Sequence, residues 1–383
     1  MQTYKIKSIL RFFLHIFWIF PVNKRKLFFS SFKGSTISCS PFYICEEFQK
    51  KYNDYKIIWC SNNIEHRKLL TNYGNIKFVK FNSFLYIFHL FTSKILINNA
   101  SFPTWIPFRN KKQIIINTWH GGGAYKKIGA SESNSINIQK REMQSSKDTK
   151  YFISSSKMFT DVMKKSTFVS EEKFLQIGLP RNDIFFNSEK ILTTKQKVFQ
   201  ELSLSQNNFI ILYAPTYRGS SLNSDVPENN LNISKLKNAI KSHFKKNAFV
   251  LFRGHYFNNY DEINNFDLNV SNYPNMQELL CSVDMLITDY SSSMWDFSFT
   301  KKPCILYCTD LEKYKNERGF YTEPEKWGFP IAQSNDELEK IIFDFDNYKY
   351  LKAVEENHKY FGSYENGNAT KKIVEIISNE LKK

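Results

Sequence analysis

The chain has 383 residues, which is enough for two to three domains of ordinary size and for one or two large apolar cores. Apolar residues make up 42% and charged residues 23%, which excludes a disordered chain and a polytopic membrane protein. The 53 basic residues exceed the 37 acidic ones by 16, so an anionic partner is expected.

The N-terminal part of the chain carries an uneven share of this charge. The first acidic residue is Glu46, and seven lysines and arginines precede it. Within this part, Ile9–Phe20 reads ILRFFLHIFWIF and ends at Pro21. As a helix it would be about 18 Å long, too short for a hydrocarbon core of about 30 Å. A basic arm beside an apolar run favours an anionic membrane surface over nucleic acid.

Two interpretations of residues 1–23 remain open. In the first, this segment lies in the membrane interface, with its aromatic side chains among the headgroups and the basic residues on anionic lipid. In the second, it is a first helix packed on the protein core. A cleaved signal peptide does not fit, because Lys24-Arg25-Lys26 follow in place of a small-x-small cleavage site.

Short apolar runs alternate with segments of helical spacing through the rest of the chain. Runs such as IIIN, FIILY, FVLF and MLIT do not alternate with polar residues, which is typical of strands buried on both faces of a parallel sheet. The pattern predicts a doubly wound α/β fold. Predicted helices include Pro41–Tyr52, Met276–Val283 and Asp336–Phe345. Predicted strands are Lys26–Ser30, Lys56–Cys60, Lys77–Phe81, Ile95–Asn98, Gln113–Thr118, Tyr151–Ser154, Lys173–Ile177, Phe209–Ala214, Ala248–Arg253, Leu268–Val270, Met285–Asp289 and Cys304–Tyr307.

A polar stretch, Asn187–Asn208, separates the two sets of strands. We therefore predict an N-terminal domain over residues 24–187 and a C-terminal domain over residues 188–383, with residues 1–23 as the membrane-associating segment. Open parallel sheets bind ligands at the carboxyl ends of their strands. The side chains that directly follow each predicted strand are thus the candidate site residues.

The most informative strand end runs into Trp119-His120-Gly121-Gly122-Gly123. Consecutive glycines let backbone amides approach a ligand or form an anion-binding nest. A histidine at a strand end is suited to general base catalysis because its pKa lies near neutrality. A glycine-rich turn with a structural histidine explains the same residues. The motif is not G-x-G-x-x-G, so no dinucleotide site is expected.

Two further strand ends carry an arginine. Arg181 follows a proline turn, where a guanidinium can hold phosphate bidentately or pair with Asp183 on the surface. Thr216 and Arg218 follow the strand that ends at Ala214 and offer a hydroxyl and a charge. An ordinary strand cap is the alternative for these last two residues.

The last two candidate strand ends carry charged side chains and hydrogen-bond donors. Arg253, Gly254 and His255 can bind a phosphate and supply a proton. Ser291-Ser292-Ser293 open a helix after the strand that ends near Asp289, and a helix start attracts phosphate. Asp296 lies about one turn further on. A plain N-cap accounts for the serines equally well.

The cysteine pattern does not indicate a metal site. No C-x-x-C pair occurs, and no second pair accompanies Cys304 and Cys308. Buried, reduced thiols of a cytosolic protein are the better interpretation. No D-x-D pair follows a predicted strand either, so we expect neither a metal nor another cofactor.

Six segments in this order resemble the CDP-glycerol glycerophosphotransferase family, which includes teichoic acid primases and polymerases and related capsule enzymes. They are TWHGGGAYKKIG, GLPRNDIFF, ILYAPTYR, RGHY, LITDYSSSMWDF and DLEKYKNERGFY, and the resemblance spans Leu27 to Tyr321. It implies a GT-B fold, in which two Rossmann-like domains face each other across a cleft, at the cytoplasmic face of the membrane. It also implies transfer of glycerol phosphate or ribitol phosphate from a CDP-alditol to a hydroxyl of a lipid-linked or saccharide acceptor, with release of CMP.

The resemblance also implies roles for particular residues. His120 resembles the family's catalytic base, and His255 resembles a second essential histidine near the pyrophosphate. Gly121 and Arg218 are added to the expected donor site from their places at strand ends. The positions that match donor-contacting residues of the family are Arg181, Pro215, Thr216, Arg253, Gly254, Ser291, Ser292 and Asp296.

One departure leaves the substrate open. Teichoic-acid members commonly read W-H-G-T-P, whereas this chain has Gly122-Gly123 after the first glycine. A capsule or another surface polymer is therefore as good an expectation as wall teichoic acid. Two alternative functions are a GT-B glycosyltransferase that uses a UDP- or GDP-sugar, and a non-catalytic basic protein that binds membrane or polymer. A nucleic-acid partner is not expected.

Overall fold

The computed structural model describes residues 9–71, 74, 76–109, 111–216, 218–219, 224–225, 230–254 and 265–383. The chain divides into two compact units. Unit 1 holds the described residues up to Gly121, Ile128–Asp183 and Ser363–Lys383, and unit 2 holds Gly122–Lys127 and Ile184–Gly362. These units differ from the predicted domain ranges: residues 363–383 lie in unit 1, and residues 122–127 and 184–187 lie in unit 2.

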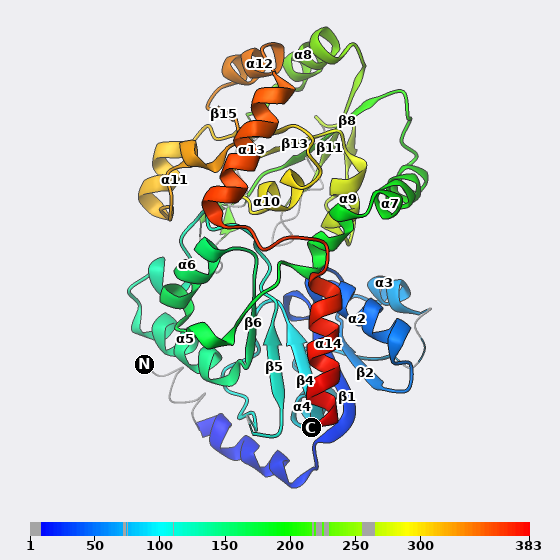
Figure 1. Ribbon diagram of the computed structural model, residues 1–383, viewed down its shortest axis with the longest axis vertical. Helices are drawn as coiled ribbons and strands as arrows, with labels where there is room; N and C mark the ends of the chain where they lie inside the picture. Colours follow the sequence, from blue (N-terminus) through cyan, green and yellow to red (C-terminus); the bar gives the residue numbers. More distant parts are fainter. Residues whose placement is uncertain are drawn as a thin grey trace. The chain divides into compact units, whose positions relative to one another are not determined.

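Unit 1 contains a seven-stranded parallel sheet with the order β3-β2-β1-β4-β5-β6-β7 (Figure 1). Leu27 of β1 pairs with Ile57 of β2 on one side and with Ile95 of β4 on the other. The order reverses between β1 and β4, as in Rossmann folds. The strands are β1 (Asn23–Ser30), β2 (Lys56–Cys60), β3 (Ile76–Val79), β4 (Ser93–Asn98), β5 (Ile114–Asn117), β6 (Tyr151–Ser154) and β7 (Phe174–Gln176).

Both faces of this sheet are buried, as the apolar runs predicted. Leu27 and Phe29 belong to a core cluster with α2 (Cys39–Lys51) and α14 (Ala369–Lys382). Phe28 points to the opposite face and packs with α4 (Phe84–Thr92). The apolar stripe of α14, which includes Ile373, Val374 and Ile377, thus buries itself against unit 1, and this explains why the C-terminal residues leave unit 2.

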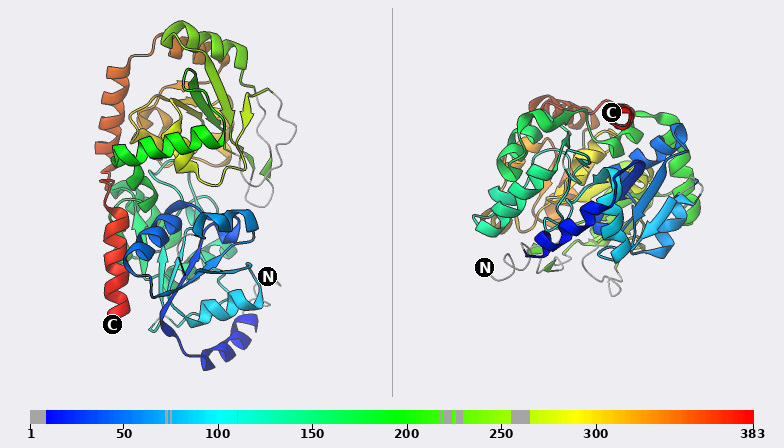
Figure 2. Two further views of the ribbon diagram at one scale, coloured as in Figure 1. Left: turned by 90° about the vertical axis from the view of Figure 1, so that its right-hand side faces the viewer. Right: turned by 90° about the horizontal axis from the view of Figure 1, so that it is seen from below.

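The N-terminal segment packs one of its faces on unit 1. Residues 9–13 are α-helical and η1 (Leu14–Ile19) continues them as a 3₁₀-helix beside α4 (Figure 2, dark blue). Leu14 is buried, and Phe17 stacks on Phe91 with ring centroids 5.1 Å apart. Arg109 donates from Nη2 to the backbone oxygen of Phe17, at 2.8 Å. The packed-helix interpretation therefore holds for this face.

Unit 2 contains a six-stranded parallel sheet with the order β12-β11-β8-β13-β14-β15, the same order as the first six strands of unit 1. The sequence did not predict β15 (Ile331–Ala332) or the hairpin β9 (Arg218–Gly219) and β10 (Ser224–Asp225). Strands of two residues are too short to show a periodicity. The other strands are β8 (Phe209–Ala214), β11 (Ala248–Phe252), β12 (Leu268–Asn269), β13 (Met285–Thr288) and β14 (Cys304–Tyr307).

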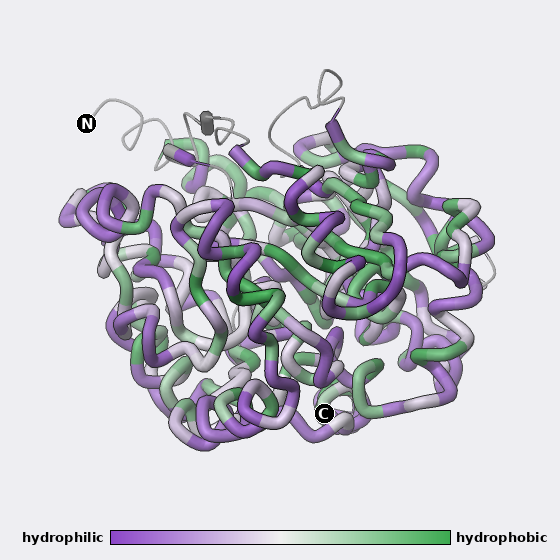
Figure 3. The backbone as a smooth tube through the Cα atoms, turned by 90° about the horizontal axis from the view of Figure 1, so that it is seen from above, coloured by the Kyte–Doolittle hydropathy of each residue, from purple (hydrophilic) through white to green (hydrophobic). Residues whose placement is uncertain are grey.

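Helices cover both faces of this second sheet. On one face α8 (Ile233–Phe244) and α12 (Asn335–Phe343) bury Leu236 and Ile342 with the apolar residues of β8 and β13. On the other face lie α9 (Met276–Ser282) and α10 (Ser293–Ser298). Figure 3 shows the apolar strands inside more hydrophilic helices.

The remaining helical elements complete the two units. They are η2 (Phe32–Gly34), α3 (Ile64–Arg67), η3 (Lys68–Leu70), η4 (Gly129–Ser131), α5 (Ile136–Asp148), α6 (Lys157–Thr167), η5 (Glu171–Lys173), η6 (Pro180–Phe186), α7 (Ser188–Glu201), α11 (Leu311–Glu317), η7 (Pro324–Trp327) and α13 (Asn347–Phe361). Among the described residues, no helix combines the length and the apolar character that a membrane span requires. All six cysteines are buried free thiols.

Candidate active site

In unit 1 the candidate base, His120, lies at the carboxyl edge of the sheet. It follows β5, next to the point where the strand order reverses between β1 and β4. Asn99, just after β4, accepts a hydrogen bond on Oδ1 from the backbone N–H of Phe32, just after β1, at 2.8 Å. The ring of Phe32 meets the His120 imidazole edge-on, with centroids 5.6 Å apart. Three strand ends thus converge on this histidine.

The protonation of His120 follows from its own hydrogen bond. Its Nδ1 lies 2.7 Å from the backbone oxygen of Asn99. Because a carbonyl oxygen can only accept, Nδ1 must carry the proton, and the lone pair of the neutral ring is on Nε2. The imidazole is exposed, so a substrate hydroxyl can reach it. This is the arrangement that a general base requires.

The turn before His120 is held in an unusual backbone conformation. Trp119 has φ +52°, which a bulky side chain rarely adopts. Its backbone N–H donates to Oδ1 of Asn117 at 2.9 Å, and its ring stacks on the His120 imidazole with centroids 4.7 Å apart. Strained backbone of this kind persists where the surroundings fix it, which is common at active sites.

Arg181 also lies in unit 1, in η6. Arg181 is only 2% exposed, so its side chain does not lie on the surface. Its Nη1 donates to Sγ of Cys39, at the start of α2, at 3.4 Å. Asp183 accepts the backbone N–H groups of Ala369 and Thr370, and so caps α14. A donor-contacting role for Arg181 stays a prediction.

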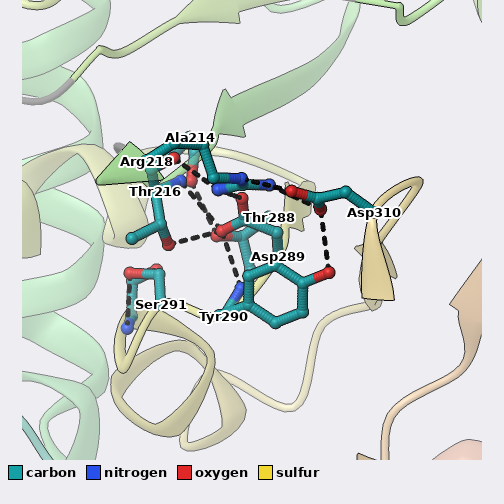
Figure 4. Close-up of polar contacts among 9 residues, drawn as sticks. Ala214, Thr216, Arg218, Thr288, Asp289, Tyr290, Ser291 and Asp310 are labelled. Carbon is teal, nitrogen blue, oxygen red and sulfur yellow. Dashed lines mark hydrogen bonds and ion pairs between the residues drawn. The ribbon is translucent and has the colours of Figure 1, made fainter. Parts of the chain in front are cut away.

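In unit 2 the strand order reverses between β8 and β13, and the residues after these two strands are joined by hydrogen bonds (Figure 4). Asp289 accepts on Oδ1 from the backbone N–H of Thr216 at 2.8 Å, and also from the Thr216 hydroxyl. The same oxygen accepts the backbone N–H of Tyr290 at 2.7 Å. Pro215 is buried beside them. Asp289 therefore shapes the strand ends where a nucleotide binds in folds of this order.

Arg218 is held between two carboxylates (Figure 4). It donates from Nη1 to Asp289 Oδ2 at 2.8 Å, and from Nε to Asp310 Oδ2 at 2.6 Å. A further bond from Nη1 reaches the backbone oxygen of Thr216 at 2.7 Å. Tyr290 stacks on Tyr314 beneath the guanidinium, and the Tyr290 hydroxyl donates to Asp310 at 2.9 Å.

The electrostatics of this cluster follow from its burial and its two anions. Burial alone would lower the pKa of Arg218, but Asp289 and Asp310 outweigh it and raise that pKa above its ordinary value. Burial likewise opposes the ionisation of Asp310, yet its bonds with Arg218 keep the pKa of this carboxyl below its usual range. Asp289 and Asp310 neutralise the charge of Arg218 within the protein. These ion pairs connect the ends of β8, β13 and β14.

The residues after β11 are only partly described. Arg253 donates from Nη1 to the backbone oxygen of Tyr273 at 2.6 Å, and burial lowers the pKa of its guanidinium to about 10. The backbone N–H of Gly254 donates to Oγ of Ser271 at 2.9 Å. His255 lies outside the described residues, so its predicted role stays a prediction.

The serines after β13 form the start of α10. Ser291 accepts on Oγ from the backbone N–H of Ser293 at 3.2 Å, so it caps part of the first turn. Ser292 makes no side-chain cap bond. Asp296 is 3% exposed and accepts from Nε2 of Gln277, on α9, at 3.1 Å. The structure thus places Asp296 inside unit 2, and its contact with a donor stays a prediction.

The sequence interpretation assigned no role to several residues that organise these strand ends. Asn117 is the polar last residue of an apolar strand and Asn99 directly follows another, and that change of polarity was the available signal. Asp289 directly follows a strand and stood inside a quoted motif. Asp310 opens the last quoted motif, but no local pattern pointed to its partner Arg218, which lies 92 positions away along the chain. Among the described residues, no group of three or more histidines, cysteines or carboxylates is placed to hold a metal ion.

Comparison with known proteins identifies the family and agrees with the fold. The model of the CDP-glycerol:poly(glycerophosphate) glycerophosphotransferase family matches residues 12–379. The chain belongs to this family. It is therefore a phosphotransferase with a GT-B-like pair of Rossmann-like units, as the resemblance implied.

The relatives make several kinds of teichoic acid. The chain is 28% identical to a teichoic acid poly(glycerol phosphate) polymerase of Bacillus spizizenii, over 94% of each chain. It is also 28% identical to a teichoic acid glycerol-phosphate transferase of Staphylococcus aureus, over 93% of each. A structure of the wall teichoic acid polymerase TagF superposes with a TM-score of 0.83 at 28% identity, and the match covers 98% of this chain and 94% of that one.

Proposed function

We propose that this glycerophosphotransferase transfers glycerol phosphate, or ribitol phosphate, from a CDP-alditol to a hydroxyl of a lipid-linked or saccharide acceptor. The observation that carries this proposal is the Asn99 carbonyl on Nδ1 of His120, an exposed residue, which puts the lone pair of the neutral imidazole on Nε2. The relatives include both glycerol-phosphate and ribitol-phosphate enzymes, so both donors are retained.

The chemistry assigns one step to His120. Its Nε2 takes the proton of the acceptor hydroxyl while the oxygen attacks the phosphorus that carries the alditol. The new O–P bond forms, the bridging P–O bond breaks, and CMP leaves with the electron pair of that bond. Phosphoryl transfer depends mainly on positioning and on charge stabilisation. We assign the donor to the strand ends of unit 2, where Thr216, Arg253 and Ser291 lie.

The test measures nucleotide release from CDP-glycerol, CDP-ribitol and UDP-glucose, each with and without a lipid-linked acceptor. We expect acceptor-dependent CMP from one of the two CDP-alditols. Release of UDP from the sugar nucleotide would instead establish a glycosyltransferase. Nucleotide binding without any release would favour a binding protein, and would overturn the proposed reaction.

We also propose that unit 1 rests on an anionic membrane. The face of the N-terminal helix that points away from the core is apolar: Ile9, Phe12, Phe13, Ile16 and Ile19 are each more than half exposed. Phe84 and Leu85 of the neighbouring helix α4 are exposed as well. A contiguous apolar surface of this kind is typical of an interaction site.

The charge distribution supports this proposal. Residues 1–45 and 66–131 hold 17 of the 53 basic residues and none of the 37 acidic ones, so these two stretches contain the entire positive excess. Several of these lysines lie near the amino ends of strands, which share one edge of a parallel sheet. Every strand of the unit 1 sheet has a lysine within three residues of its start, namely Lys24, Lys56, Lys77, Lys94, Lys112, Lys150 and Lys173.

Vesicle flotation tests the membrane proposal. We expect binding to vesicles that contain phosphatidylglycerol, weaker binding at high salt, and little binding to phosphatidylcholine alone. The double substitution Phe12→Glu and Ile16→Glu should abolish binding. Leu192→Glu, at an equally exposed leucine of unit 2, is the matched control and should not. Unchanged binding of the double variant would refute the role of this face.

A further inference from the structure

The segment Gly122–Lys127, here called the strap, belongs to unit 2 although the residues on both of its sides belong to unit 1. It begins two residues after His120. The sequence interpretation assigned its glycines to a ligand and gave no role to the motif that contains Arg318–Tyr321. The contacts of the strap give a structural role to the glycines and to this motif.

The strap pairs with that motif through the backbone. The N–H of Lys127 donates to the oxygen of Gly319 at 3.0 Å, and the N–H of Tyr321 donates to the oxygen of Tyr125 at 2.7 Å. Lys126 and Phe320 form an antiparallel bridge between these bonds. The motif is thus the docking strand of the strap.

Tyr125 anchors the strap in the interior of unit 2. The residue is 3% exposed, and its ring lies 5.1 Å from the ring of Trp327 and 5.4 Å from that of Phe361, centroid to centroid. Its hydroxyl has no hydrogen-bond partner among the described residues. Tyr125 is therefore held by the packing of its ring, and the oxygen adds nothing to the anchor.

The glycines are required by this packing. A Cβ atom on Gly122 would lie 2.1 Å from Cδ1 of Trp295, a fully buried ring on α10. Gly123 has φ +66°, and a Cβ there would lie 2.4 Å from the ring of Tyr125. Trp295 cannot move aside easily, because Phe361 and His358 pack against it. The close approach that glycine permits is therefore to protein side chains.

We propose that the strap is a positioning element for His120, with Gly122 and Tyr125 as its positioning residues. Consecutive Cα atoms are about 3.8 Å apart, so the Cα atom of His120 can lie no further than about 7.6 Å from that of Gly122. A strap that is held rigidly therefore restricts the positions that His120 can take relative to Gly122. The inference rests on the proposed function, in which His120 is the base. A misplacement of about 1 Å can cost about 10²-fold in rate.

The test compares Tyr125→Ala, which removes the anchoring ring, with Tyr125→Phe, which removes only the unpartnered hydroxyl. We expect Tyr125→Ala to lower kcat by about 10- to 100-fold and to leave the dissociation constant of CDP-glycerol within about twofold, because no donor-contacting side chain changes. Tyr125→Phe should keep the wild-type kcat. Gly122→Ala, which keeps the Tyr125 ring, should act in the same direction as Tyr125→Ala. Circular dichroism at the assay temperature establishes the folded fraction of each variant.

A second measurement does not depend on catalysis. Hydrogen–deuterium exchange should rise at residues 119–124 in Tyr125→Ala and not in Tyr125→Phe. Wild-type kcat in Tyr125→Ala, or a loss that only follows the unfolded fraction, would overturn the strap as a positioning element. If the wild-type protein releases no CMP, the proposed function fails, and unchanged exchange in Tyr125→Ala would then overturn the strap separately.

Discussion

Replacement of Arg218 by methionine should destabilise unit 2 by leaving two carboxylates without their cation. The Asp289 side chain is 2% exposed and that of Asp310 is 27% exposed, so solvent screens the first pair far less than the second. Removing one partner of a buried ion pair costs about 3–5 kcal/mol. In the variant, Asp289 still accepts hydrogen bonds from the backbone N–H and hydroxyl of Thr216 and from the N–H of Tyr290. We therefore expect a loss of stability at the lower end of this range, about 3 kcal/mol.

The measurement is thermal unfolding of the full chain, followed by calorimetry, together with hydrogen exchange at the strands of unit 2. A loss of about 3 kcal/mol should lower the Tm of a unit of this size by roughly 6–12 °C. Arg141→Met is the matched control. Its side chain is 58% exposed and that of its partner Glu142 is 11% exposed, so the change should cost at most about 1 kcal/mol.

The pH dependence tests the same reasoning. The pKa of Asp310 is lowered in the folded protein, so the pair stabilises above the ordinary carboxyl value of 3.8 and this contribution is lost as pH falls below it. The difference in the free energy of unfolding between Arg218→Met and wild type should therefore shrink as the pH falls below 3.8. A loss below about 1 kcal/mol at pH 7, or a gap that does not change with pH, would show that the two carboxylates do not depend on Arg218.

Two further predictions concern unit 1. His120→Ala should lower kcat by about 10²–10⁴-fold with little change in the KM for the CDP-alditol. Wild-type turnover in steady-state assays would exclude the base assignment. Glu380, which accepts bonds from Lys150, Tyr151 and Lys383, has its pKa lowered from 4.5 to about 2 because these bonds outweigh its burial. The stability that these bonds contribute is present above pH 4.5 and is lost towards pH 2. In urea unfolding, the free energy of unfolding should fall between pH 7 and pH 3 by on the order of 2 kcal/mol more in the wild type than in Glu380→Gln. An equal fall in the two proteins would contradict this.

Many of the strands could be predicted because a strand that is buried on both faces is a continuous apolar run in the sequence. The predicted limits of β2, β6, β8 and β14 agree with the structure, and each of these strands is an apolar run. Elsewhere the limits shift by one to three residues, as at α2, which begins at Cys39 instead of Pro41. The two-residue strands β9, β10 and β15 were not predicted, because pairing with a neighbour defines them and not their own side chains; β12, equally short, was predicted.

The candidate site was predictable only in part. His120, Thr216 and Ser291 stood out because polar residues directly follow apolar strands, and strand ends of parallel sheets meet at one edge. Arg218 also follows a predicted strand, but its two carboxylate partners were not predicted, and its contact with the donor stays a prediction. The N-terminal helix combined both interpretations, since one face packs on unit 1 and the other is exposed.

The sequence by itself determined the fold class, the family and the candidate base, because these depend on local patterns: apolar runs, the residues after them, and six ordered motifs. Only the tertiary structure decided the order of the strands, the return of α14 to unit 1, and the pairing of the strap with residues 319–321. Each of these joins residues far apart in the chain. Their contacts form because burying an apolar surface is favourable wherever a complementary surface exists, and separation along the sequence leaves no local sign of where that surface is.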